Sequence, residues 1–173
     1  MKDLLRLAAA AALAALLWPE IARYRGEREL RRGSDALRRA LGSASAAEAR
    51  PELYRAAVLA ARATPRLPGD PRPRLLAGSA RLVSGQGLEA LDFYRDALAT
   101  GERAEIDLNL GRAHALAGER PEAQAALLRA LWISPALGPA LPEALAKRML
   151  EDVAKRENDL KAGLLTEPPP LPD

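Results

Sequence analysis

Small residues recur in this chain at a fixed offset of 33 positions, and this period restricts the possible folds more than any other feature. The matching pairs are Gly78 and Gly111, Gly85 and Gly118, Ala90 and Ala123, and the dipeptides Ala97-Leu98 and Ala130-Leu131. A repeat of this length is typical of stacked helical hairpins, in which each hairpin buries its apolar face against its neighbours. The period therefore predicts an all-α chain made of consecutive hairpins.

The composition is consistent with close helix packing. Hydrophobic residues make up 49% of the chain and aromatic residues only 3%, because alanine dominates the apolar set. Alanine has the highest helix propensity and a small side chain, so helices rich in it can approach closely. The absence of cysteine excludes a disulfide, a thiolate metal site and a cysteine nucleophile.

Glycine has two different roles in the repeats. Gly78 and Gly111 fall inside predicted helices, where glycine costs about 1 kcal/mol relative to alanine, so we expect a compensating close contact between helices. Gly85 and Gly118 fall where the chain reverses between helices, and a positive φ is accessible to glycine there without penalty. These glycines place two hairpins at residues 71–103 and 104–137.

The two units resemble the tetratricopeptide repeat (TPR) family. The first unit has matching residues at Gly78, Gly85, Ala90, Tyr94, Ala97 and Leu98. The second has them at Leu110, Gly111, Gly118, Ala123, Leu127, Ala130, Leu131 and Pro135. Both depart from the pattern: Arg74 and Asp107 replace the first large residue, and Arg81 and His114 replace the first aromatic residue. The resemblance implies a short α-solenoid that binds other proteins.

Less regular helices on either side are expected to complete a TPR-like domain over residues 50–158. Arrays of this kind need about three repeats for stability, and only two are clear. The segment Glu52 to Thr64 is predicted as the second helix of a degenerate upstream unit, beginning near Pro51. An amphipathic capping helix is predicted over 141–158, followed by a Pro-rich tail, 159–173. Its last residues, 166–173, are expected to be a disordered or polyproline II terminus, with a proline-motif ligand as the alternative.

The N-terminus predicts a transmembrane or signal-anchor helix in residues 1–22. Leu7 to Trp18 is an unbroken apolar run of 12 residues, preceded by Lys2 and Arg6. The stretch from Leu4 to Ala22 covers roughly 28 Å as a helix, close to the bilayer core of about 30 Å. The alternatives are a cleaved secretory signal and a buried helix of a soluble protein. No small-x-small cleavage site follows the run, as a cleaved signal would require.

An Arg-rich juxtamembrane segment, residues 23–49, follows the anchor. Its helix is predicted to end at Gly33, and a short helix capped by Ser34 or Asp35 to stop at Gly42. The membrane-proximal basic residues are Arg23, Arg25, Arg28, Arg31 and Arg32. They either attract an anionic leaflet or pair with Glu27 and Glu29.

The position of the body relative to the membrane is open to two arguments. The positive-inside rule places these arginines in the cytoplasm, whereas long C-terminal domains translocate largely regardless of charge. We expect a single-pass protein of a bacterial inner membrane with a periplasmic body. Charge is distributed unevenly, with 16 Lys/Arg against 8 Asp/Glu in residues 1–82 and 10 against 15 in residues 83–173.

The first helices of the two hairpins are predicted to form a groove for a partner segment. Its residues are Leu75, Ser79, Leu82, Val83, Leu108, Asn109, Arg112, Ala115 and Leu116. The family's two-carboxylate clamp, which grips acidic C-terminal peptides, needs Lys and Asn at the positions of Leu75 and Ser79. The groove is instead largely apolar with an arginine edge, which suits an amphipathic or extended segment.

Chemical sites have no support in the sequence. His114 is the only histidine, and Glu89, Asp92 and Asp96 stand in a row along one helix face, unlike converging metal ligands. No motif for catalysis, cofactor binding or nucleic-acid binding is present. The sequence predicts a non-enzymatic adaptor or assembly factor without cofactor, metal or small-molecule substrate, with proteins of a membrane or envelope complex as partners. The alternative is a secreted, periplasmic, chaperone-like TPR binder.

Overall fold

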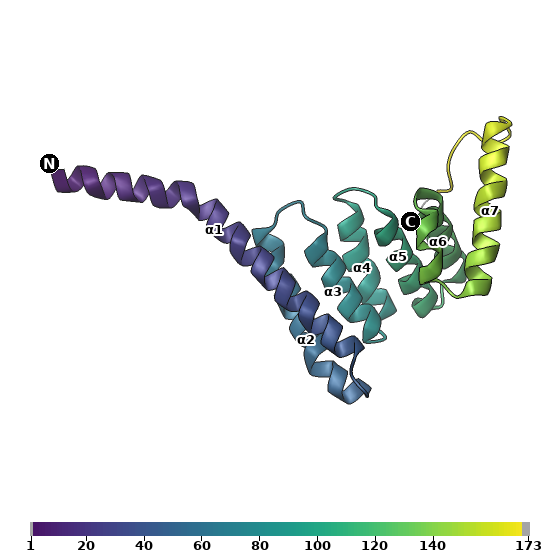
Figure 1. Cartoon of the computed structure of the whole chain (residues 1–173), viewed down its shortest axis with the longest axis horizontal. Helices are drawn as coiled ribbons and strands as arrows, with labels where there is room; N and C mark the ends of the chain where they lie inside the picture. Colours follow the sequence, from purple (N-terminus) through teal and green to yellow (C-terminus); the bar gives the residue numbers. More distant parts are fainter. Residues whose placement is uncertain (1, 171–173) are drawn as a thin grey trace.

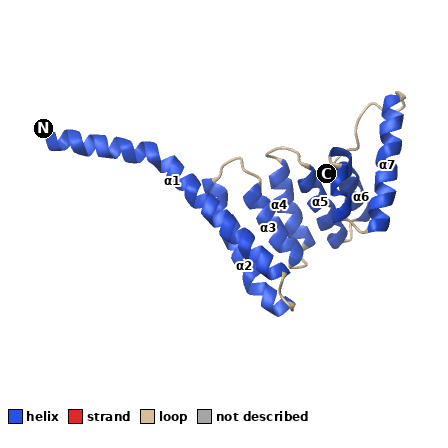
Figure 2. Cartoon of the chain, viewed as in Figure 1, coloured by secondary structure: helices blue, strands red, loops and turns tan. Residues whose placement is uncertain are grey.

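The computed structural model describes the backbone of residues 2–170 and the side chains of residues 13–170. This part of the chain is helical and has no strand (Figure 2). Its helices, with η marking the two 3-10 helices, are α1 (Lys2–Leu41), α2 (Ala46–Ala63), η1 (Thr64–Arg66), α3 (Arg72–Val83), α4 (Gly87–Leu98), α5 (Ala104–Ala117), α6 (Arg120–Ile133), η2 (Pro135–Ala140) and α7 (Glu143–Lys161).

Helix α1 is one continuous element of 40 residues, so the predicted break at Gly33 and the separate short helix after it are wrong. A Cβ atom at Gly33 would lie 2.6 Å from Leu76 Cδ2 and 3.3 Å from Leu59 Cβ. Glycine is therefore present because α2 and α3 pack closely against α1 there, and not as a helix stop. The same holds for Gly26, whose Cβ would lie 2.9 Å from Leu67 Cγ.

The first part of α1 extends away from the rest of the protein (Figure 1). The helix changes direction in the region of Pro19, which lies inside it (Figure 1). Proline has no amide hydrogen and clashes with the carbonyl group four residues earlier, and this commonly bends a helix. The bend separates a projecting arm from the half of α1 that packs on the body.

Helix α2 begins earlier than predicted. Ser45 is its N-cap, with the Oγ atom accepting a hydrogen bond from the amide of Glu48 at 3.3 Å, while Glu48 Oε2 accepts one from the amide of Ala44. This arrangement is close to a capping box, and its Ser-x-x-Glu pattern is present in the sequence. Pro51 consequently lies within the helix and not at its start.

Three hairpins follow one another along the body: α1 with α2, α3 with α4, and α5 with α6 (Figure 1). Each hairpin contacts the next, and the first helices of neighbouring hairpins also touch, α1 on α3 and α3 on α5. Gly85 and Gly118 have φ values of 79° and 86°, so both predicted turn positions are confirmed. Upstream of the two predicted repeats, α2 packs on the second half of α1.

Buried side chains form successive clusters along the body. The first lies between α1, α2 and α3, the second between α4, α5 and α6, and the third between α5, α6 and α7. Alanine supplies many of their members, and Tyr94 is the largest fully buried side chain. Each hairpin thus shares its buried apolar side chains with a neighbouring helix or hairpin.

The chain after α7 makes a contact with the body. Helix α7 packs on α6 and η2, and the chain after it runs back toward α6 (Figure 1). Pro169 is buried, and its carbonyl accepts a hydrogen bond of 3.1 Å from Arg129 Nη1. A charged donor strengthens such a bond, which explains why a proline-rich end is held in place.

Within the described residues, no helix combines the length and the apolar character that a membrane crossing requires. The predicted anchor, residues 1–22, falls in part outside this range, because the side chains of residues 1–12 are not described.

Candidate partner-binding groove

Close packing inside each hairpin positions the first helices. A Cβ at Gly78 would lie 2.7 Å from Cε1 of Tyr94, and a Cβ at Gly111 would lie 2.6 Å from Cγ of Leu127. These are the close helix contacts that the two glycines predicted. They hold α3 against α4 and α5 against α6, and so leave the other faces of α3 and α5 to neighbouring hairpins or to a partner.

A hollow of about 520 Å³ lies between α1 and α3. Apolar and hydroxyl side chains from both helices line it, with charged residues among them. The lining residues are Glu27, Leu30, Arg31, Ser34 and Leu37 of α1 and Arg72, Leu75, Leu76 and Ser79 of α3.

An ion-pair network connects α1 and α3 at this hollow. Arg72 Nη2 donates to Glu27 Oε1 at 2.6 Å, and the same guanidinium pairs with Asp70. The hydrogen bond from Arg72 lowers the pKa of Asp70, and the two carboxylates raise the pKa of Arg72. Arg31 also lines the hollow and has no salt bridge among the described residues, so its guanidinium is unpaired there.

Two of the predicted groove residues, Leu75 and Ser79, line this hollow. The Ser79 hydroxyl lies 3.3 Å from the Tyr94 hydroxyl, which gives the buried phenol a hydrogen-bond partner. Burial raises the pKa of Tyr94, while the Ser79 contact opposes this shift. Ser79 therefore contributes to the lining and also fixes α4 beneath it.

The α5 part of the predicted groove is mostly taken up by the chain itself. Leu108 is only 5% exposed and packs in the cluster that includes Met149 of α7, so its prediction as a surface residue is wrong. Arg112 donates to Asn109 Oδ1 at 3.3 Å and to the carbonyl of Ala140, at the end of η2, at 2.7 Å. The predicted arginine edge is thus bonded to η2.

The remaining predicted residues lie at several places. Leu82 is half-buried against the second cluster. Ala115 and Leu116 are exposed on α5, Leu116 to 48%. Val83 is exposed and lines a second hollow, of about 680 Å³, formed by α2, α4 and another face of α3. The nine residues therefore do not form one surface.

The sequence analysis does not predict that α1 forms one wall of the hollow, because it places a helix end at Gly33. The signal was present: Gly26 and Gly33 are seven residues apart, as are Leu30 and Leu37, so each pair shares a helix face. Gly33, like Gly78, lies inside a helix, where its low helix propensity is offset by a close contact with a neighbouring helix.

The basic segment of α1 is not neutralised by its own acidic residues. Glu27 pairs with Arg72 at 2.6 Å, and Glu29 pairs with Arg66 at 3.0 Å, so both carboxylates are engaged by the body. Among the described residues, Arg23, Arg25, Arg28, Arg31 and Arg32 take part in no salt bridge. The pairing of the basic residues with Glu27 and Glu29 is therefore wrong.

Two buried polar residues lie outside the hollow. His114 is 1% exposed, and its Nδ1 lies 2.7 Å from Glu119 Oε2, a contact that spans the turn between α5 and α6. Asp107 is fully buried, and neither carboxylate oxygen has a hydrogen-bond partner. Burial, followed by the charge of Glu102, raises the pKa of Asp107 to about 7.

The acidic row on α4 is a solvated face in the structure. Glu89 pairs with Arg81 at 3.0 Å, and Asp92 and Asp96 are exposed. Across residues whose side chains are described, no group of three or more His, Cys, Asp or Glu is arranged to hold a metal ion.

No protein-family model, curated protein or solved structure matches this chain. The TPR resemblance therefore remains a prediction from the residues.

Proposed function

We propose that this chain is a non-enzymatic TPR-like adaptor, tethered to a bacterial inner membrane by residues 1–22, that binds a segment of a partner protein between α1 and α3. The observation that carries the proposal is the hollow of about 520 Å³ between these two helices. Its lining combines apolar residues such as Leu30 and Leu75 with the hydroxyl groups of Ser34 and Ser79. Such a mixture suits the side chains and backbone of a bound segment.

The dimensions and charge of the hollow restrict the partner segment. The lining residues of α1 span positions 27–37, roughly 15 Å along the helix axis. That length accommodates about five residues of an extended segment or about three turns of a helix. The unpaired guanidinium of Arg31 favours an acidic residue in the segment, next to apolar side chains that contact Leu30 and Leu75.

The arrangement of α1 also supports the proposed adaptor function. The same helix carries the predicted anchor and one wall of the hollow, so a bound partner would be held at a fixed position relative to the membrane. Exposed apolar side chains continue along the projecting arm, among them Leu13, Leu16, Leu17 and Trp18. A membrane-spanning position of residues 1–22 would cover them.

The binding proposal is tested by filling the hollow. Ser34→Arg with Ser79→Arg adds two long side chains to it, and Ser84→Arg adds one to the second hollow as a control. We expect partner proteins crosslinked and purified from membranes with the wild-type chain to be recovered with Ser84→Arg and lost with the double variant. Equal recovery with all three chains would refute the assignment.

The alternative is a secreted, periplasmic, chaperone-like binder whose N-terminal segment is removed as a signal peptide. N-terminal sequencing of the purified mature protein separates the two. A sequence beginning at residue 1 or 2 supports the anchor, whereas a start near residue 20 or later supports the secreted form.

A further inference from the structure

Helix α1 carries an exposed stripe that changes from apolar to basic along its length. Its members, Leu17, Ile21, Arg25, Arg28 and Arg32, are separated by four, four, three and four positions, so they share one helix face. All five are exposed, with Leu17 at 52% and Ile21 at 42%. Leu13, which precedes Leu17 by four positions, is also exposed and extends the apolar half.

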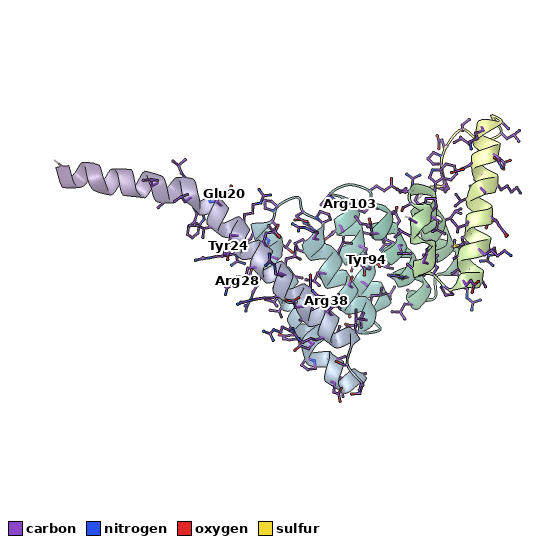
Figure 3. The ribbon with its side chains drawn as sticks, in the orientation of Figure 1. Glu20, Tyr24, Arg28, Arg38, Tyr94 and Arg103 are labelled. Carbon is purple, nitrogen blue, oxygen red and sulfur yellow. The ribbon has the colours of Figure 1, made fainter. Side chains whose placement is uncertain are left out.

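This face is directed away from the hairpins. The residues of α1 that meet the body, Gly26, Leu30 and Gly33, lie on a different face. Tyr24 and Arg28 point outward from α1, on the side opposite α3 and α4 (Figure 3). The stripe is therefore not used in the contacts between the helices.

We propose that this stripe binds the anionic lipid headgroups of the membrane surface, an inference that rests on the proposed anchoring of residues 1–22. The three arginines of the stripe are free of salt bridges among the described residues, because Glu27 and Glu29 pair with Arg72 and Arg66 of the body. Glu27 and Glu29 are thus engaged by arginines of the body, and Arg25, Arg28 and Arg32 remain able to bind an external anion.

The distance of each arginine from the membrane along α1 determines how strongly it interacts with the anionic headgroups. With Ala22, the end of the proposed span, at the boundary of the hydrocarbon core, Arg25 lies roughly 5 Å, Arg28 roughly 9 Å and Arg32 roughly 15 Å farther along the helix axis. The headgroup layer extends about 5 to 7 Å beyond the core, and surface charge acts over a further 8 Å or so at physiological salt. Arg25 and Arg28 therefore interact most strongly, and Arg32 less.

A second copy of the chain fits the stripe less well than lipid does. In a parallel pair of α1 helices, Arg28 and Arg32 would face the same residues of the other copy, and the like charges would repel. In an antiparallel pair, the arginines would lie against leucine and isoleucine. An anionic surface beside an apolar layer matches both halves of the stripe at once.

Quenching of Trp18 fluorescence tests the proposal with the full chain. Trp132→Phe leaves Trp18 as the only tryptophan, since the chain has two. The protein is reconstituted in vesicles of phosphatidylcholine and phosphatidylglycerol, with either lipid carrying the same nitroxide on the same acyl carbon. We expect the labelled phosphatidylglycerol to quench at least about twofold more than labelled phosphatidylcholine at equal mole fraction, because the arginines enrich anionic lipid nearby.

Matched variants in this background assign the effect. Arg25→Gln with Arg28→Gln and Arg32→Gln should bring the quenching ratio to about one, as should 0.5 M NaCl. Arg55→Gln with Arg120→Gln and Arg148→Gln removes equal charge from exposed positions on the body and should keep the wild-type ratio.

The outcomes separate the lipid inference from the proposed anchor. Equal quenching by both lipids in the wild-type chain would refute lipid binding by the stripe and would still support the membrane anchor. Quenching by neither would overturn both. If the stripe were instead a contact between copies, the Arg25, Arg28 and Arg32 triple variant would change the sedimentation of the detergent-solubilised chain. The wild-type quenching ratio would then be one, and this result would also refute lipid binding.

Discussion

Nη2 of Arg72 lies 2.6 Å from Oε1 of Glu27 and so connects α3, the first helix of the first predicted repeat, to α1. Both side chains are partly exposed, at 51% and 38%. The pair borders the hollow between α1 and α3. Because Glu27 is paired with Arg72, it does not neutralise the arginines of α1. One contact thus affects both the groove and the outer stripe.

The Glu27–Arg72 pair is expected to contribute little to stability, because exposed ion pairs are screened and ordering their side chains costs entropy. A double-mutant cycle with Glu27→Gln and Arg72→Gln should give a coupling free energy of about 0.2 to 1 kcal/mol from urea unfolding. Raising NaCl to 1 M should reduce it. A coupling that is large and insensitive to salt would contradict this assignment.

Gly33→Ala should destabilise the chain even though alanine is the better helix former. The propensity gain is about 1 kcal/mol, whereas overpacking a tight contact typically costs about 1 to 3 kcal/mol. The added Cβ would lie 2.6 Å from Leu76 Cδ2, whose side chain is buried.

Gly42→Ala is the matched control for this substitution. At Gly42, the nearest atoms to an added Cβ are backbone oxygens of the same helix at 3.7 Å, which is ordinary contact. We expect Gly42→Ala to leave the urea midpoint unchanged or to raise it. A rise of similar size in both variants would show that α1 does not pack on α2 and α3.

Asp107 should make stability fall as the pH rises. Its pKa is about 7 in the folded chain, against about 3.9 when unfolded, so the folded state binds more protons between these values. The free energy of unfolding therefore decreases by up to about 1.4 kcal/mol per pH unit from pH 4 to pH 7, and then levels off. Asp107→Asn should remove this decrease.

The measurement for Asp107 is the difference in unfolding free energy between wild type and Asp107→Asn from pH 4 to pH 8. The variant should gain on the wild type as the pH rises. Other carboxylates, such as Asp70, whose lowered pKa acts in the opposite direction, cancel in this difference. The exposed Asp92→Asn is the control and should give no trend; a flat difference for Asp107→Asn would contradict its burial as an unpaired acid.

Removing residues 166–173 should lower the melting temperature, because the bond from Arg129 to the Pro169 carbonyl and the burial of Pro169 are lost. A loss of about 1 kcal/mol corresponds to a shift of about 2 to 4 °C for a chain of this size. A truncation after Pro170 keeps the contact and is the control. If both truncations melt like the wild type, the returning tail contributes nothing to stability.

The parts of the fold that follow from local patterns were predictable. Glycine is required at the turns because φ is positive there, as at Gly85 and Gly118. Inside a helix it indicates a close contact with another helix, as at Gly78 and Gly111. The continuation of α1 through Gly33 was not predicted, because a helix-ending glycine and a packing glycine look alike until the neighbouring helix is known. The Ser45 cap was available in the sequence and was overlooked in favour of Pro51.

The candidate site was harder to predict for a related reason. Leu75 and Ser79 were placed from the repeat pattern, and both line the hollow between α1 and α3. Leu108 and Arg112 occupy equivalent places in the next repeat, yet α7 packs with Leu108 and η2 accepts from Arg112. Contacts from a capping segment depend on where the chain folds back, and the repeat period carries no information about this.

The central claim, that the hollow between α1 and α3 holds a segment of a partner protein at the membrane, is tested most directly by photo-crosslinking in intact membranes. A photoreactive side chain at Ser34 lies in the hollow, and one at Ser84, the C-cap of α3 in the second hollow, is the control. We predict a discrete crosslinked product from Ser34 and none of that size from Ser84. No product from Ser34, or the same product from both positions, would contradict the account.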